Sequence, residues 1–243
     1  MSEATRNGDI LYIVIPAYNE QDNIRIVVED WYNVTVRTGP NSRLVIVDDG
    51  SKDDTYRILR EMAASKSQMI ALTKPNSGHG ASLLYAYQYA LDAKADYIFQ
   101  TDSDGQTIPE EFWEFWEQRA SYDMVIGHRS HREDGLSRIF VTRVLRLVVW
   151  LMFGENLLDA NTPFRLMKSA PLREVLPLIP KGFNLSNVVL SALYAKQKRS
   201  VLYRPITFRP RQGGVNSINL KRIFFIGLRA LKDFAKINKE IKP

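Results

Sequence analysis

The sequence predicts an α/β fold built on one mostly parallel sheet that is flanked by helices. Short apolar runs rich in β-branched residues alternate with segments of helix length, which is the pattern of successive βαβ units. The first runs also end in clusters of turn-forming polar residues, as buried parallel strands do. The chain of 243 residues is suited to a single domain, and we expect that domain to span residues 1–243.

Four strands and three helices are expected in the first half of the chain. The first apolar run covers residues 10–15 and is predicted to stop at Pro16. Three further runs follow in order, at residues 43–47, 69–72 and 96–101. The segments between them have helix length, and we expect helices at about 21–37, 54–65 and 81–94.

The second half is less regular, although it still shows strand and helix patterns. Strands are expected at residues 122–127, 164–167 and 200–203. Helices are expected at residues 138–153 and 183–196. Neither a repeat nor a low-complexity linker divides the chain, which again favours one domain.

Composition and charge narrow the classes of function. The absence of cysteine excludes disulfides, zinc–thiolate sites and cysteine nucleophiles. The polar first nine residues predict no signal peptide. The net charge of +6 favours an anionic partner, which could be a nucleotide phosphate, a nucleic acid or an anionic membrane surface.

Three polar clusters follow the carboxyl ends of predicted strands. They cover residues 16–20, 48–51 and 102–106. In open α/β sheets, ligands bind outside the carboxyl ends of the strands, so these clusters should meet at one edge. Capping of the next helix is an alternative explanation for any single cluster, but it explains the set of three poorly.

The third cluster predicts a divalent metal site. Asp102 and Asp104 can converge on one cation in a turn that leaves a strand, and Gln106 could add a neutral oxygen. Hard oxygen ligands of this kind suit Mg²⁺ or Mn²⁺, with diphosphate oxygens and water completing the shell.

The first two clusters predict a nucleoside site. Glu20, Asp48 and Asp49 could accept hydrogen bonds from a ring N–H of a base or from ribose hydroxyls. Pro16 and Tyr18 could form an apolar floor for the base, although Tyr18 could equally be an ordinary packing residue.

Together these motifs resemble family 2 glycosyltransferases of the GT-A fold. The resemblance rests on the order and spacing of four segments, 16–20, 47–53, 76–81 and 102–106. It implies that Glu20 and Asp49, with Asp48 nearby, hold the nucleoside and that Asp102 and Asp104 hold the metal on the diphosphate. It also implies a nucleotide-binding half at about 10–106 and an acceptor half at 107–217.

His79 departs from the pattern, because relatives often carry Lys or Arg there. A phosphate contact is possible, but an exposed histidine at the start of a helix is the favoured interpretation.

The second half resembles the dolichyl- and polyprenyl-phosphate sugar transferases of this family. Three segments carry the likeness, at 106–110, 127–129 and 204–217, whereas Pro163 replaces a glycine that relatives carry. The resemblance implies an inverting enzyme that moves a hexosyl unit from a UDP- or GDP-linked sugar to a polyprenyl or dolichyl phosphate. The alternative is a family 2 transferase that acts on a sugar hydroxyl in glycan assembly.

A lipid phosphate acceptor would need arginines to position it, and no general base. Its second pKa lies near ~6, so much of it is already a dianion at neutral pH. We expect Asp104, Arg129 and Arg211 to form the catalytic set, with further acceptor contacts from three more residues: Arg138, Arg143 and Ser217. If the acceptor were a hydroxyl, Asp159 or Asp134 would be the candidate base.

A lipid acceptor also implies contact with a membrane surface. The apolar segment 139–153 would form a helix of ~22 Å, too short to span a hydrocarbon core of ~30 Å, so it would lie at the interface. Residues 218–243 predict a basic amphipathic helix. We therefore expect a peripheral protein on the cytoplasmic face of a membrane. Both helices could instead cap the core.

A third hypothesis is a nucleic-acid or membrane binding module that uses the basic tail. It leaves the carboxylate clusters unexplained, so no nucleic-acid partner is expected. The donor sugar and the oligomeric state stay open.

Overall fold

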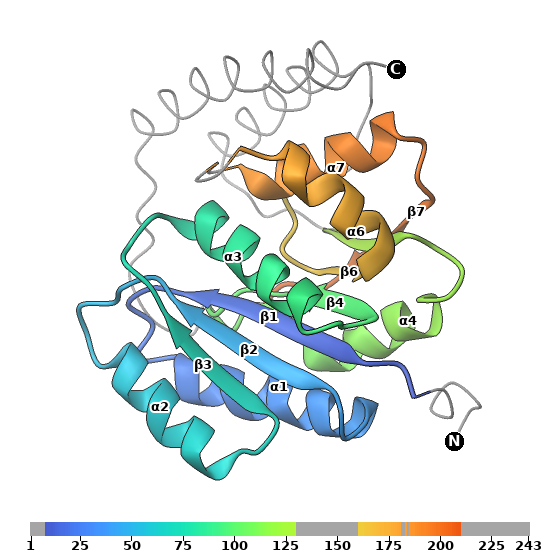
Figure 1. Cartoon of the computed structure of the whole chain (residues 1–243). Coiled ribbons are helices and arrows are strands. Elements are labelled where there is room, and N and C mark those ends of the chain that lie inside the picture. The colour runs from blue at the N-terminus through green and yellow to red at the C-terminus, as the bar shows by residue number, and fades with distance from the viewer. Residues whose placement is uncertain (1–7, 130–159, 181–182, 184, 210–243) are drawn as a thin grey trace.

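The computed structural model describes residues 8–129, 160–180, 183 and 185–209. A sheet lies between two layers of helices (Figure 1). Within the described residues the sheet has seven strands in the order β3-β2-β1-β4-β6-β5-β7. The strands are β1 Leu11–Ala17, β2 Arg43–Asp48, β3 Met69–Thr73, β4 Tyr97–Gln100, β5 Met124–Arg129, β6 Arg165–Lys168 and β7 Val201–Ile206.

Six α-helices and two short 3₁₀ helices accompany these strands in the described part of the chain. The α-helices are α1 Ile24–Thr38, α2 Thr55–Ser65, α3 His79–Asp92, α4 Phe112–Glu117, α6 Ser169–Val175 and α7 Ser186–Lys196. The 3₁₀ helices are η2 Pro109–Glu111, which leads into α4, and η3 Leu176–Leu178, which follows α6.

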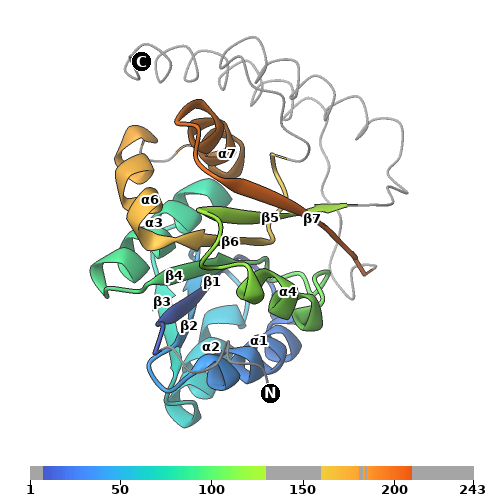
Figure 2. The ribbon, with the colours of Figure 1, turned by 90° about the vertical axis from the view of Figure 1, so that its right-hand side faces the viewer.

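The sheet is mostly parallel, as predicted. Strands β1 to β4 are parallel neighbours, and β5 pairs with β7 in the same sense. Strand β6 pairs antiparallel with both β4 and β5, so in the described sheet it is the one strand of opposite direction. Figure 2 shows β6, β5 and β7 lying in succession beyond β4.

The prediction that Pro16 ends the first strand was wrong, because β1 continues to Ala17. Successive residues of β1 face alternate neighbours: the Val14 carbonyl accepts from Thr101 N on the β4 side, and the Ala17 carbonyl accepts from Asp49 N on the β2 side. Pro16 faces the β4 side, where regular pairing ends at Val14. Its missing N–H therefore removes no bond of the ladder.

Helices α1, α2 and α4 cover one face of the sheet, and α3, α6 and α7 cover the other (Figure 1). On the first face Trp31 of α1 packs against Phe99 and Phe112 with ring centroids 5.2 and 6.5 Å apart, and against Phe164 at 6.0 Å. Tilted and edge-to-face pairs of this kind contribute about 0.5–1.5 kcal/mol each beyond their burial. This aromatic cluster joins both halves of the chain.

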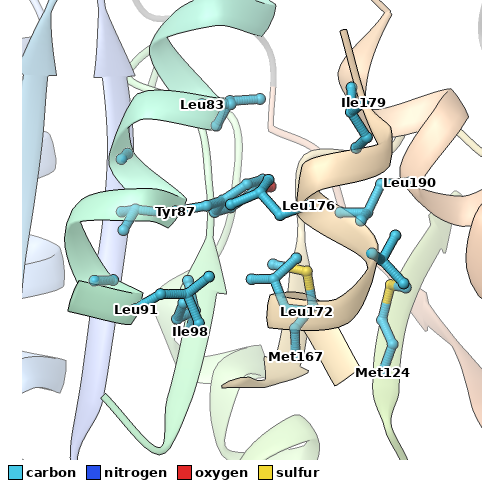
Figure 3. Close-up of a cluster of buried hydrophobic side chains, with 14 of the residues drawn as sticks. Leu83, Tyr87, Leu91, Ile98, Met124, Met167, Leu172, Leu176, Ile179 and Leu190 are labelled. Carbon is cyan, nitrogen blue, oxygen red and sulfur yellow. The ribbon is translucent and has the colours of Figure 1, made fainter. Parts of the chain in front are cut away.

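The second face holds a larger aliphatic core. Figure 3 shows Leu83, Tyr87 and Leu91 of α3 on one side of the core, and Leu172 of α6 and Leu190 of α7 on the other. These five side chains are almost fully buried. Because α3 lies in the first half of the chain and α6 and α7 lie in the second, this core fixes one half against the other.

Several predicted elements shift by a few residues, and two helices were not predicted. Helix α7 begins at Ser186 rather than 183, and β7 extends to Ile206 because it pairs with β5 along its whole length. Helices α4 and α6 have only 6 and 7 residues, which is too short for a helical period to show in the sequence.

Some predictions fall outside the described residues. They are the helix at 138–153, the amphipathic helix at 218–243, and the residues Asp134, Arg138, Arg143, Asp159, Arg211 and Ser217. Within the described ranges, none of the helices has the length and hydropathy needed to cross a membrane.

Candidate active site

The loops after β1 and β2 are joined to each other by hydrogen bonds at the carboxyl edge of the sheet. Asn19 N donates to Ser51 Oγ at 2.9 Å, and Asn19 Oδ1 accepts from Lys52 N at 2.8 Å. Glu20 N donates to Thr55 Oγ1 at 2.8 Å. Asn19 has a φ of 54°, a left-handed conformation that asparagine tolerates better than most residues. The two predicted polar clusters therefore form one rigid unit.

Asp48 supports this unit from below. Its side chain is buried, and it accepts hydrogen bonds from Ser51 N at 3.3 Å and from Thr73 Oγ1 at 2.8 Å. We expected Asp48 to face the nucleoside. In the structure these hydrogen bonds direct its carboxylate into the turn and toward β3.

Gly50 makes the tight approach of the next loop possible. Its φ is +66°, and a Cβ there would lie 2.9 Å from Asn76 N and 3.1 Å from Lys74 O. Asn76 Nδ2 also donates to the Asp49 carbonyl at 2.9 Å. The loop between β3 and α3 can therefore pack directly on the turn after β2 only because residue 50 has no side chain.

Asp49 lies between that turn and the start of α3. Its Oδ1 accepts from Ser77 N at 2.9 Å and from Lys74 Nζ, and its Oδ2 accepts from Gly78 N at 2.8 Å. Burial alone would raise the pKa of Asp49. The hydrogen bonds from Lys74, Ser77 and Gly78 outweigh burial and hold this pKa below its ordinary value, so Asp49 is an ionised acceptor at neutral pH.

Asp102 and Asp104 lie in the loop after β4, with buried Ser103 between them. Asp104 Oδ1 accepts from Gln106 N at 3.1 Å, and Gly105 has a left-handed φ of 70°. The loop therefore turns sharply just after the strand, and both carboxylates are only half-buried. This is the local geometry in which two carboxylates can reach one cation.

Gln106 connects this loop to the segment that follows β7. Its Nε2 donates to the Arg209 carbonyl at 3.1 Å, and its own carbonyl accepts from Arg209 N at 2.8 Å. An isolated bridge between Thr107 and Phe208 continues this contact. The amide nitrogen of Gln106 thus has a structural partner, while its Oε1 is the atom that would serve as the predicted metal ligand.

His79 contacts the metal-site loop directly, which the favoured sequence interpretation missed. It is the first residue of α3 and half-exposed, as expected, but its Nε2 lies 3.0 Å from Asp102 Oδ1. Burial of the ring by the surrounding protein would by itself lower the pKa of His79. Asp102, Asp104 and Asp49 outweigh this effect and raise the pKa above its ordinary value. Since Gly78 donates to Asp49 and His79 contacts Asp102, the start of α3 links the loop after β2 to the loop after β4.

The donor set suits a loosely held hard cation. Among the residues that the structure describes, no group of three or more His, Asp and Glu side chains could enclose a metal ion. Asp102 and Asp104 supply two carboxylates, so the remaining positions of an octahedral shell would fall to the diphosphate and water. The residues present fit Mg²⁺ or Mn²⁺ brought in with a nucleotide.

The residues proposed to surround the nucleoside differ in exposure. Glu20 is nearly buried, and its Oε2 accepts from Asn23 Nδ2 at 2.9 Å. Tyr18 is 42% exposed, which argues against ordinary core packing and leaves its ring available to a base. Pro16 is buried within β1 beneath the edge.

The structure describes part of the sheet edge at β5 and β6, where the acceptor residues were predicted. Arg129 ends β5, which is parallel to β4, so its backbone lies at the same edge as Asp102. Thr162 is buried in the turn that enters β6, just before Pro163. That turn is held by Arg165.

Arg165 was not singled out from the sequence, although it is fully buried. Its guanidinium donates to the Thr162 carbonyl at 2.7 Å, to the Ala160 carbonyl at 3.2 Å and to the Asn187 carbonyl at 3.1 Å. It thereby fixes the turn before β6 against the start of α7. Its five rigid donors explain why arginine suits this position.

The comparison with protein families decides the classification. The model of glycosyl transferase family 2 matches residues 12–176. The chain belongs to glycosyl transferase family 2. The match covers the elements from β1 to α6 and the loops of this family 2 chain that carry Glu20, Asp49 and Asp102.

Sequence relatives of this family 2 chain are transferases named for lipid phosphates. The undecaprenyl-phosphate 4-deoxy-4-formamido-L-arabinose transferase of Pectobacterium atrosepticum is 25% identical over 76% of this chain and 60% of that protein. The UDP-N-acetylglucosamine–dolichyl-phosphate N-acetylglucosaminyltransferase of Methanococcus voltae is 26% identical over 68% of this chain and 71% of that protein. The matched region is thus about three fifths of the length of the first of these relatives.

Solved structures confirm the GT-A-type architecture of this family 2 chain. Glucosyl-3-phosphoglycerate synthase from Mycobacterium tuberculosis, in complex with phosphoglyceric acid, superposes with a TM-score of 0.71 at 16% identity, covering 98% of this chain and 82% of that one. The same synthase in complex with Mn²⁺, UDP-glucose and glycerol 3-phosphate gives a TM-score of 0.68 at 16% identity, covering 98% and 83%.

Proposed function

We propose that this chain is a metal-dependent, inverting glycosyltransferase that moves a hexosyl unit from a UDP- or GDP-linked sugar to a polyprenyl phosphate. One observation supports the donor most strongly. Ser77 and Gly78 donate to Asp49, and the next residue, His79, contacts Asp102. Three consecutive residues therefore hold both Asp49, which suits a nucleobase, and Asp102, which suits a metal–diphosphate. A nucleoside diphosphate needs both kinds of group close together.

Each donor residue has a distinct part in this proposal. Glu20 and Asp49 accept hydrogen bonds from the nucleoside, and Tyr18 with Pro16 forms the apolar surface beside it. Asp102 and Asp104, with Gln106, would hold Mg²⁺ or Mn²⁺; when bound, the ion neutralises charge that develops on the leaving diphosphate. Asp48 supports the turn from which Asp49 projects.

The acceptor proposal draws on the relatives and on chemistry. The relatives named above act on undecaprenyl phosphate and dolichyl phosphate according to their names. A phosphate dianion needs positioning by arginine and no proton removal, which suits Arg129 and Arg211. A phosphate oxygen bonds to the anomeric carbon as the bond to the diphosphate breaks on the opposite face, so the anomeric configuration inverts. Three residues would add acceptor contacts: Arg138, Arg143 and Ser217.

The proposal also covers the layout of the chain and its place in the cell. Residues 10–106 would bind the nucleotide, residues 107–217 would receive the acceptor, and residues 218–243 would contact a membrane, all within one domain. The excess of basic over acidic residues suits an anionic lipid surface. We place this peripheral contact on the cytoplasmic face of the membrane.

A transfer assay tests the proposal. The full chain is incubated with labelled UDP- or GDP-linked hexoses and Mn²⁺, in the presence of either phytanyl phosphate or an oligosaccharide. We expect label in the phytanyl phosphate product, and we expect EDTA to abolish it. Label found only on the oligosaccharide would replace the lipid phosphate with a hydroxyl acceptor. Transfer that persists in EDTA would contradict the role given to Asp102 and Asp104.

A further inference from the structure

Lys74 connects the candidate base site to the loop before α3. It follows the end of β3, and its side chain is 14% exposed. Its ammonium group contacts Asp49 Oδ1, Ser77 Oγ at 2.5 Å and the Pro75 carbonyl at 3.3 Å. An ammonium has three N–H donors, so these three acceptors use all of them. Lys74 therefore has no donor left for a ligand.

Asp49, by contrast, keeps one acceptor position. An ionised carboxylate offers about four lone-pair sites. Oδ1 accepts from Lys74 and Ser77, whereas among the described residues Oδ2 accepts only from Gly78. One lone-pair site on Oδ2 is therefore unused by the described residues, on a side chain that is 5% exposed at the sheet edge.

We propose that Lys74 is a positioning residue that sets nucleobase specificity, by holding Asp49 as an acceptor-only carboxylate with a single open position. Such a group selects a base whose ring edge presents an N–H donor, namely uracil or guanine. It rejects cytosine and adenine, whose corresponding ring nitrogens carry lone pairs. This inference rests on the proposed function, and it assigns Lys74 a task that does not involve the reacting atoms.

The chemistry of rejection depends on the state of Asp49. A protonated Asp49 could donate a hydrogen bond to the ring nitrogen of cytosine, which would weaken the discrimination. Burial raises the pKa of Asp49, and the hydrogen bonds led by Lys74 lower it again. Without the lysine, burial would raise the pKa of Asp49 with less opposition, and only the N–H groups of Ser77 and Gly78 would hold the carboxyl group. A site built to accept an N–H rejects a ligand that lacks it, because opposed lone pairs repel and the buried acceptor stays unsatisfied.

The experiment compares nucleotide affinities in three variants. Binding of UDP, GDP, CDP and ADP is measured with Mn²⁺ for the unaltered chain, Lys74→Met, Lys74→Arg and Lys66→Met. Lys66, the residue just after the end of α2, is the matched control. Its side chain is 16% exposed and forms an ion pair at 2.8 Å with Glu29 of α1. Thermal unfolding is followed for every variant. Lys74→Gln replaces Lys74→Met if the methionine variant does not fold.

We expect the unaltered chain to prefer UDP or GDP over CDP and ADP by at least about ten-fold. Lys74→Met should lower the affinity for the preferred nucleotide about ten-fold and reduce the ratio of that affinity to the affinity for CDP. Lys74→Arg should keep most of the affinity and most of the ratio. In the transfer assay the KM for donor should rise while kcat changes little. Lys66→Met should match the unaltered chain in nucleotide affinity.

Three outcomes test the inference and the proposed function separately. If the folded, unaltered chain binds no nucleoside diphosphate with Mn²⁺, the proposed function fails. If it prefers UDP or GDP and Lys74→Met keeps both the affinity and the preference, the role of Lys74 is overturned while the proposed function stands. A uniform loss of all four nucleotides in Lys74→Met, with an unchanged ratio, also overturns the specificity role.

Discussion

Among single residues, the carboxylates at the sheet edge divide into two kinds. Asp48 and Asp49 are buried and accept hydrogen bonds that hold the surrounding loops together. Asp102 and Asp104 are half-buried and lie in a loop of their own after β4. Substitutions in the first pair should therefore affect stability as well as binding, whereas substitutions in the second pair should affect binding and catalysis above all.

Asp104→Ala tests the second kind. We expect transfer activity to fall by at least about 100-fold, which corresponds to about 2.7 kcal/mol of lost transition-state stabilisation. The free energy of unfolding should change by less than about 1 kcal/mol, because the side chain is not in the core. Activity and urea unfolding measure the two effects. The control is Asp92→Ala on α3, an exposed carboxylate that accepts from Gln88 at 2.8 Å. Equal activity in both variants would contradict the metal role.

Asp49→Asn tests the first kind through pH. The pKa of Asp49 is lower in the folded chain than its unfolded value of about 3.9. Its ionised form therefore stabilises the fold fully above about pH 5, and this contribution is lost as pH falls through the folded-state pKa. We expect the gap in unfolding free energy between the original chain and the variant to be constant from about pH 6 to 8 and to shrink toward about pH 3. Urea titrations across this range check it, and a gap independent of pH would contradict it.

At the scale of elements, the pair of β5 and β7 depends on a glycine. A Cβ at Gly127 would lie 2.5 Å from Ile206 Cδ1 and 3.0 Å from its Cγ1. Gly127 and Ile206 belong to neighbouring strands at the end of the sheet, so a side chain there would push the strands apart or force Ile206 from its rotamer.

Gly127→Ala should destabilise the chain by about 1–3 kcal/mol in urea unfolding, as overpacking does. Ile206→Val removes the Cδ1 that the new methyl group meets, so the double variant should recover much of that loss in a double-mutant cycle. Gly8→Ala is the control, because a Cβ at that position would meet nothing within 4 Å. Additive effects of the two substitutions would contradict the proposed collision.

The elements of the first half could be predicted because local pattern and final structure agree there. Strands β1 to β4 are short apolar runs between turn residues, and α1 to α3 have the length that a helical period needs. The end of β1 could not be predicted from Pro16, because the answer depends on where β4 stops pairing. The short helices α4 and α6 are stabilised by packing of residues such as Phe115 and Leu172, which local sequence does not reveal.

The candidate site, like the elements, could be predicted only in part from the sequence. Glu20, Asp49 and Asp102 could be placed at one edge, since each follows a parallel strand. Lys74 and His79 could not, because their partners are 25 and 23 residues away in the chain. The inward orientation of Asp48 also depends on a distant residue, Thr73. Contacts between separate loops therefore form the part of the site that required the structure.

At the scale of the whole molecule, the net charge of +6 bears on where the chain works. We expect the full chain to sediment with vesicles that contain phosphatidylglycerol and to be released as salt rises from about 0.05 to 0.5 M, because screening weakens attraction between basic residues and anionic lipid. Vesicles of phosphatidylcholine alone are the control. Equal binding to both kinds of vesicle at every salt concentration would contradict an electrostatic membrane contact.

The reversed direction of β6 has a consequence for how such a chain can diversify. Strand β5 ends at the carboxyl edge, and the antiparallel β6 begins at that same edge. The two ends of the connection between these strands, Arg129 and Arg165, therefore lie at the same edge of the sheet. Doubling the length of a flexible connection costs only about 0.6 kcal/mol in closure entropy. Evolution could therefore lengthen or replace this connection while the strands of the sheet and the loops after β1, β2 and β4 remain unchanged.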